Sequence, residues 1–171
     1  RDVEAPPFPM VRVATEECVP LDRPAVRVTW RAFSSARSDT CLVLRPRCLV
    51  AGVGCNRGTG AREILDLVRT AFAEHELALQ SLSCITTLDV KRNETGLLEA
   101  AQVLGVPVIF YPPEAVRDVD VPNPSDTVIR HMGVKSVCEA TALKRAETQR
   151  LLVPKVRSRN ATLAVALEAS T

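Results

Sequence analysis

The chain has 171 residues, of which 46% are hydrophobic and 25% are charged, and its net charge is +2 at neutral pH. These values are typical of one globular domain with a real core, and they exclude wholesale disorder. The balanced charge gives no support for a nucleic-acid surface. We expect neither a membrane span nor a signal peptide, because no apolar run approaches the roughly 20 residues of a spanning helix.

Six cysteines and two histidines are present, and no two cysteines form a C-x-x-C pair. A structural zinc site therefore has little support. Several of the cysteines lie inside apolar runs, where a thiol behaves as a small buried hydrophobe. We accordingly expect free thiols in the reducing cytoplasm.

The first part of the chain, residues 1–46, holds six prolines and a single plausible strand at 25–30. It lacks the apolar periodicity that a core of its own would need. We interpret it as a linker or the remnant of a preceding domain. The domain proper is predicted at 47–171.

The pattern sharpens at 48–53, a short apolar run that ends at glycines and predicts a buried strand. A helix is expected at 60–79, because apolar residues recur there at helical spacing. Thr59 is the predicted N-cap of this helix, and Glu63 lies in its first turn, where the helix dipole favours an acid.

A second strand is predicted at 82–87 and a third at 106–110. Between them we expect a helix at 94–104, which Gly105 closes in the usual C-terminal position. Strand, helix and strand at this spacing indicate parallel βαβ units.

A proline-rich stretch follows and is expected to be a loop. The next predicted helix spans 137–150, and Ser136 and Glu139 have the spacing of a capping box at its start. The segments 151–156 and 163–167 complete the predicted strands. Together the elements predict an α/β fold, a three-layer α/β/α sandwich with a mostly parallel sheet, in which the C-terminal strands could be antiparallel at one edge.

Two unusual loops, 52–60 and 89–94, follow the first and second predicted strands. Ligands of open α/β sheets bind beyond such strand ends, and parallel strands would bring both loops to one rim. The first loop offers glycine amides and Arg57, a combination suited to anions. Its glycine spacing fits neither the dinucleotide fingerprint nor the P-loop. A tight turn without a ligand remains the alternative.

Charged side chains in the second loop are candidates for substrate binding and acid–base catalysis. Lys91 could bind a carboxylate and Glu94 could activate a water; alternatively they belong to a solvated turn in which Glu94 serves the helix dipole. Cys55 is expected at a helix N-terminus beside Arg57, an arrangement that would lower the pKa of its thiol, although a packing or binding role is favoured. His131 is a candidate acid or base, or a surface residue.

Four blocks in the same order resemble the C-terminal domain of the cobalamin-biosynthesis G/E proteins, the CbiG/CobE family. They are GVGCNRGT at 52–59, TTLDVKRNETGLLEAAQVLGVPVIFY at 86–111, GVKSVCEATAL at 133–143 and the closing segment 151–167. One block alone would be weak, but four in order are specific. The resemblance covers roughly 47–168.

The resemblance implies a place in cobalamin synthesis. The family's G protein is cobalt-precorrin-5A hydrolase, which opens the δ-lactone of the corrin precursor, with loss of acetaldehyde. The shorter E protein comprises essentially this domain, so a non-catalytic corrinoid carrier is the alternative. The residues before 47 favour the G type. An unrelated anion- or nucleotide-binding α/β domain is the third possibility.

The resemblance also suggests residue roles. Glu94 would be the base, and Lys91 and the backbone amides of 54–59 would polarise the lactone carbonyl. Substrate binding would fall to Gly54, Cys55, Asn56, Arg57, Gly58, Thr59, Arg92 and Glu139. Cobalt would arrive within the substrate, so no cofactor or metal bound by the protein is expected. The expected partner is the corrin precursor rather than nucleic acid or membrane, and a homodimer or a complex with other cobalamin-pathway enzymes remains open.

Overall fold

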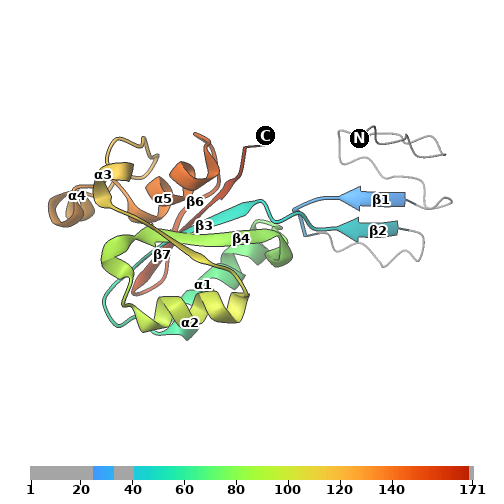
Figure 1. Cartoon of the computed structure of the whole chain (residues 1–171), viewed down its shortest axis with the longest axis horizontal. Helices are drawn as coiled ribbons and strands as arrows, with labels where there is room; N and C mark the ends of the chain where they lie inside the picture. The colour runs from blue at the N-terminus through green and yellow to red at the C-terminus, as the bar shows by residue number, and fades with distance from the viewer. Residues whose placement is uncertain (1–24, 33–40, 170–171) are drawn as a thin grey trace, which may run out of the picture.

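A computed structural model describes residues 25–32 and 41–169. The predicted linker region therefore lies largely outside the described residues, and its interpretation as a linker or remnant stays a prediction. Its one predicted strand is present as β1 (Ala25–Val28), which pairs in parallel with β2 (Cys41–Leu44). This small sheet projects from the body of the molecule (Figure 1).

The main sheet has five strands in the order β5-β4-β3-β7-β6. Their bounds are Leu49–Cys55 for β3, Leu82–Leu88 for β4, Val108–Tyr111 for β5, Leu151–Arg157 for β6 and Ala161–Leu167 for β7. The strands β3, β4 and β5 are parallel, whereas β7 is antiparallel to both of its neighbours.

The sheet is thus mixed, which corrects the prediction of a mostly parallel sheet. The short turn after β6 makes β7 its antiparallel partner. Strand β7 then pairs with β3 inside the sheet, so that of the two C-terminal strands only β6 is an edge strand. Most of β7 is buried accordingly.

Helices cover both faces of this sheet (Figure 1). On one face, α1 (Ala61–Glu74) and α2 (Thr95–Leu104) pack over the larger apolar core. On the other face, α5 (Val137–Ala146) packs against the central strands, with the short α3 (Pro113–Val116) and α4 (Asp126–Met132) beside it. None of the helices in the described part of the chain combines the length and apolar character needed to cross a bilayer.

Several helix ends differ from those predicted. Helix α1 ends at Glu74 rather than 79, although the apolar pattern continues, because Leu77 and Ala78 are buried in an extended segment. The amide of Ala78 donates a hydrogen bond to the carbonyl of Trp30 instead of to a helical partner. The proline-rich stretch predicted as a loop contains α3 and α4. The predicted left-handed Gly105 at the end of α2 is confirmed.

The strand directions bring three connections to the same end of the sheet, where the strands terminate. Strands β3, β4 and β6 all end there, since β6 is antiparallel to β7 and β7 to β3. Three connecting segments therefore meet at this end of the sheet: the loop 56–60, the segment 89–94 and the β6–β7 turn at 158–160. Ligands of α/β folds bind at such strand ends.

Candidate functional site

The two loops expected on one rim are in direct contact. The amide of Gly58 donates a hydrogen bond to Oε2 of Glu94, with a donor–acceptor distance of 2.9 Å. Lys91 Nζ lies 3.4 Å from Oε1 of the same carboxylate. The exposed fractions of the Lys91 and Glu94 side chains are only 14% and 12%. The expectation that the two loops lie at the same end of the sheet is confirmed. We call the contact among Gly58, Lys91 and Glu94 the loop junction.

Glycine is required at two positions around the loop junction. Gly58 has a φ of +74°, which side chains rarely adopt, and this conformation directs its amide to Glu94. Gly96, in the first turn of α2, lies so close to the first loop that a Cβ there would be 2.1 Å from the carbonyl oxygen of Thr59. The backbone itself therefore holds the two loops together.

The Glu94 carboxylate is held in its ionised form. The hydrogen bond from the Gly58 amide is the main reason that its pKa is lowered, and the charges of Lys91 and Arg57 act in the same direction. Glu94 is the N-cap of α2, yet its side chain makes no capping hydrogen bond. The side chain is thus not solvated as in an open turn, although Glu94 lies at the start of α2, where the helix dipole favours an acid.

The first loop is also fastened to the β6–β7 turn. The Asn56 amide donates to the Asn160 carbonyl, and the Thr59 hydroxyl donates to the carbonyl of Asn56, both at 2.8 Å. Thr59 is consequently not the N-cap of α1, as predicted; Gly60 takes that position. The amides of Asn56, Gly58 and Thr59 all donate within the protein, so they do not form a vacant oxyanion hole.

A cavity of about 480 Å³ opens beside the loop junction. It is lined by the ends of β3 and β4, by α4 and by the β6–β7 hairpin. Of the candidate catalytic and binding residues, those lining it are Gly54, Cys55, Asn56, Lys91 and His131, whereas Glu94 does not line it. The sequence interpretation missed three further basic residues, which are Lys155, Arg157 and Arg159. Their spacing of two residues in a strand-like segment was the available signal, because such spacing places side chains on one face.

The expectation for Cys55 is wrong, and the predicted binding residues Arg57 and Arg92 do not line the cavity. Cys55 is the last residue of β3 rather than the start of a helix, and burial raises the pKa of its thiol instead of lowering it. This favours packing over nucleophilic chemistry. The guanidinium of Arg92 lies 4.9 Å from the ring centre of Phe110, whereas Arg57 is exposed at the tip of the first loop.

Glu139 is fully buried beneath the site. Its carboxylate accepts hydrogen bonds from the Asn123 amide and side chain and from the Lys155 amide. Ser136 is the N-cap of α5, but its side chain makes no capping bond, so the predicted capping box is wrong. Glu139 lies on the buried face of α5, and its carboxylate connects the loop at Asn123 to β6.

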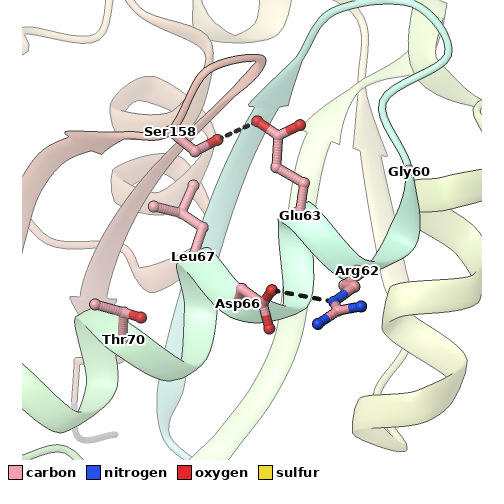
Figure 2. A pocket seen from close by; sticks show the side chains of 7 residues that line it. All are labelled: Gly60, Arg62, Glu63, Asp66, Leu67, Thr70 and Ser158. Carbon is pink, nitrogen blue, oxygen red and sulfur yellow. Dashed lines mark hydrogen bonds and ion pairs between the residues drawn. The ribbon is translucent and has the colours of Figure 1, made fainter.

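A second, open hollow of about 650 Å³ runs along α1 (Figure 2). At its upper end Glu63 accepts hydrogen bonds from the Ser158 hydroxyl and the Asn160 amide, both at 2.6 Å, and from the Asn160 side chain at 3.1 Å. Beside Glu63, the exposed side chains of Arg62 and Asp66 form an ion pair along the same helix. Glu63 therefore fixes the β6–β7 turn, which also lines the cavity, to α1.

This anchor predicts a pH-dependent stability. The hydrogen bonds from Ser158 and Asn160 lower the pKa of Glu63 below its ordinary value of 4.5, so their contribution is complete above that value and is lost as the pH falls through the lowered pKa. Urea unfolding followed by circular dichroism should show that Glu63→Gln narrows the stability difference between pH 7 and acidic pH. An unchanged difference in the variant would contradict the anchor.

No group of three metal-ligating side chains occurs among residues 25–32 and 41–169. The five cysteines within these ranges are free thiols. Fold and site together define a mixed-sheet α/β domain with a basic cavity at the strand ends, a class suited to a ligand that carries acid groups.

Comparison with known proteins identifies the family within this class. The family described as "Cobalamin synthesis G C-terminus" matches residues 49–166, and the chain belongs to this family. It is 35% identical over 126 residues to a cobalt-precorrin-5A hydrolase of Priestia megaterium, covering 74% of this chain and 34% of that protein. The chain therefore spans about a third of the length of this relative.

Shorter relatives are matched over more of their length. Protein CobE of a Sinorhizobium species is 37% identical over 124 residues, covering 69% of this chain and 79% of that protein. The crystal structure of CobE, a protein from the cobalamin biosynthetic pathway, superimposes with a TM-score of 0.67 at 35% identity. That match covers 71% of this chain and 91% of the CobE chain.

Proposed function

We propose that this chain acts on a cobalt-containing corrin precursor in cobalamin synthesis, as the C-terminal part of a cobalt-precorrin-5A hydrolase. Family membership and the hydrolase relatives support this proposal. Because the chain spans only a third of the first of these relatives, further catalytic groups can come from the remainder of such a protein. The cytoplasm is the proposed compartment, in keeping with the free thiols.

The observation that carries the proposal is the loop junction, of which Lys91 lines the cavity. Glu94 is ionised there, largely buried and oriented by the Gly58 amide and Lys91. An oriented carboxylate next to an ammonium group is the minimum that ester hydrolysis requires, since one removes a proton from water and the other stabilises the oxyanion. With three amides of the first loop already engaged, Lys91 is the proposed oxyanion donor.

The reaction would proceed in two steps. Glu94 accepts a proton from a water molecule whose oxygen attacks the lactone carbonyl, and the ring C–O bond then breaks to give a carboxylate and an alcohol. Loss of the alcohol proton and cleavage of the adjacent C–C bond would release acetaldehyde and leave the electron pair on the macrocycle, which is then protonated. Cobalt enters as part of the substrate.

One assay tests the proposed function. The chain is mixed with cobalt-precorrin-5A, and both the visible spectrum and the released acetaldehyde are followed. We expect a spectral shift together with acetaldehyde above the rate without protein. A shift without acetaldehyde would identify a carrier of the CobE kind rather than a hydrolase, and no shift would contradict any role in handling this substrate.

A further inference from the structure

We propose that the β6–β7 hairpin forms a binding wall for the peripheral carboxylates of a tetrapyrrole ligand. This basic wall consists of Lys155, Arg157 and Arg159, all of which line the cavity. The inference rests on the proposed function for the macrocycle, and it adds the residues that would hold the acid groups not undergoing reaction.

The cavity has charge of only one sign. Five of its lining residues have basic side chains, namely Lys91, His131, Lys155, Arg157 and Arg159, and none of the residues lining it is an aspartate or glutamate. Other lining residues are apolar, namely Leu88, Val90, Val128, Met132, Val137 and Ala161. A ligand that fits this lining has a flat apolar body and several acids at its edge.

No acid in the described ranges forms an ion pair with the basic wall. Among the described residues, neither Arg157 nor Arg159 forms an ion pair with an acid. Lys155 Nζ donates to the carbonyl of Asn123, which carries no charge. The charge of Arg159 makes a small contribution to the lowered pKa of Glu63, but the oxygens of Glu63 accept hydrogen bonds from the β6–β7 turn. Acid groups of a ligand can therefore pair with these charges without displacing an acid of the protein.

The basic wall is also built rigidly. Glu139 binds the Lys155 amide from below, Glu63 binds the turn from the α1 side, and Asn160 joins the turn to the first loop. A surface that is ordered before binding loses little conformational entropy when the ligand arrives. The ordered backbone thus presents two exposed guanidinium groups, and guanidinium groups bind carboxylates in a bidentate manner.

The basic wall and the loop junction face one ligand. Lys91 lines the cavity and also contacts Glu94, so the two features are continuous. A macrocycle whose acid groups lie on the basic wall would present another part of its periphery to Glu94. The basic wall therefore has the role of orienting the substrate, and its loss should weaken binding more than it slows the chemical step.

The test uses porphyrins that differ in their number of carboxylates: uroporphyrin with eight, coproporphyrin with four and mesoporphyrin with two. Visible absorption titrations compare the wild-type chain with Arg157→Gln/Arg159→Gln and with the control Arg69→Gln/Arg150→Gln, whose arginines are exposed outside the cavity. The basic-wall variant should lose roughly tenfold to a hundredfold of the affinity for uroporphyrin and much less for mesoporphyrin, because charged hydrogen bonds are lost. Circular dichroism should show unchanged folding.

An equal loss in the control variant, or an affinity that does not depend on the number of carboxylates, would overturn the proposal. Hydrolysis assays separate it from the proposed function. If acetaldehyde is released and the basic-wall variant has an unchanged KM, the basic wall is refuted while the hydrolase stands. If carboxylate-dependent porphyrin binding needs the basic wall but no acetaldehyde forms, the basic wall stands and the hydrolase is refuted.

Discussion

Replacing Glu94 with glutamine is expected to lower kcat for lactone opening by roughly 10²- to 10⁴-fold, the usual contribution of a general base. Glutamine has nearly the same shape, and its carbonyl oxygen can still accept the hydrogen bond from the Gly58 amide. The loop junction would therefore persist while the proton acceptor is lost. Acetaldehyde release under saturating substrate measures kcat, and circular dichroism verifies the fold.

The matched control is Glu99→Gln, on the exposed side of α2, which should leave both rate and stability unchanged. Near wild-type turnover in Glu94→Gln would remove Glu94 from the mechanism and leave it the role of a clamp between the loops. A further distinction comes from KM: a base should alter kcat with little change in KM, whereas a clamp should alter both.

The largest expected effect on stability comes from Gly52→Ala. Gly52 lies in β3 where α5 crosses the sheet, and a Cβ added there would be 1.8 Å from the carbonyl oxygen of Cys138. That oxygen belongs to the backbone of α5 and cannot rotate away, so helix and sheet must separate. We expect a loss of about 3 kcal/mol in the free energy of unfolding, at the upper end of overpacking effects. Urea unfolding measures this loss.

Gly60→Ala is the control for Gly52→Ala. An added Cβ at Gly60 would meet nothing within 4 Å, and its φ of −71° suits any residue. The weaker N-cap and the reduced entropy of the unfolded chain should nearly cancel, giving a change below about 1 kcal/mol. Similar stabilities for the two variants would contradict the close packing of α5 on β3.

The features that sequence predicted well are those encoded locally. The buried runs gave β3 and β4, the periodic segments gave α1 and α2, and Gly105 marked the end of α2 because only a left-handed residue fits there. The contact between the two loops followed from a general rule, since parallel strands end on one edge. None of these inferences needed knowledge of distant contacts.

The features that sequence missed depend on distant partners. The position of β7 beside β3 follows from pairing across more than a hundred residues, which periodicity does not reveal. Glu139 had the spacing of a capping box, but its partners Asn123 and Lys155 are brought to it by the tertiary fold. The basic wall escaped notice because the strand was predicted to end at 156, and because the cavity that unites its three residues exists only in the tertiary fold.

The most direct test of the loop junction is the pH titration of the Gly58 amide resonance by nuclear magnetic resonance. The amide should follow the ionisation of Glu94, with a midpoint below the ordinary glutamate value of 4.5, and this transition should vanish in Glu94→Gln. The oriented carboxylate on which the proposed hydrolysis depends would be contradicted if the Gly58 resonance showed the same pH transition in wild type and in Glu94→Gln. A midpoint at or above the ordinary glutamate value would contradict it as well.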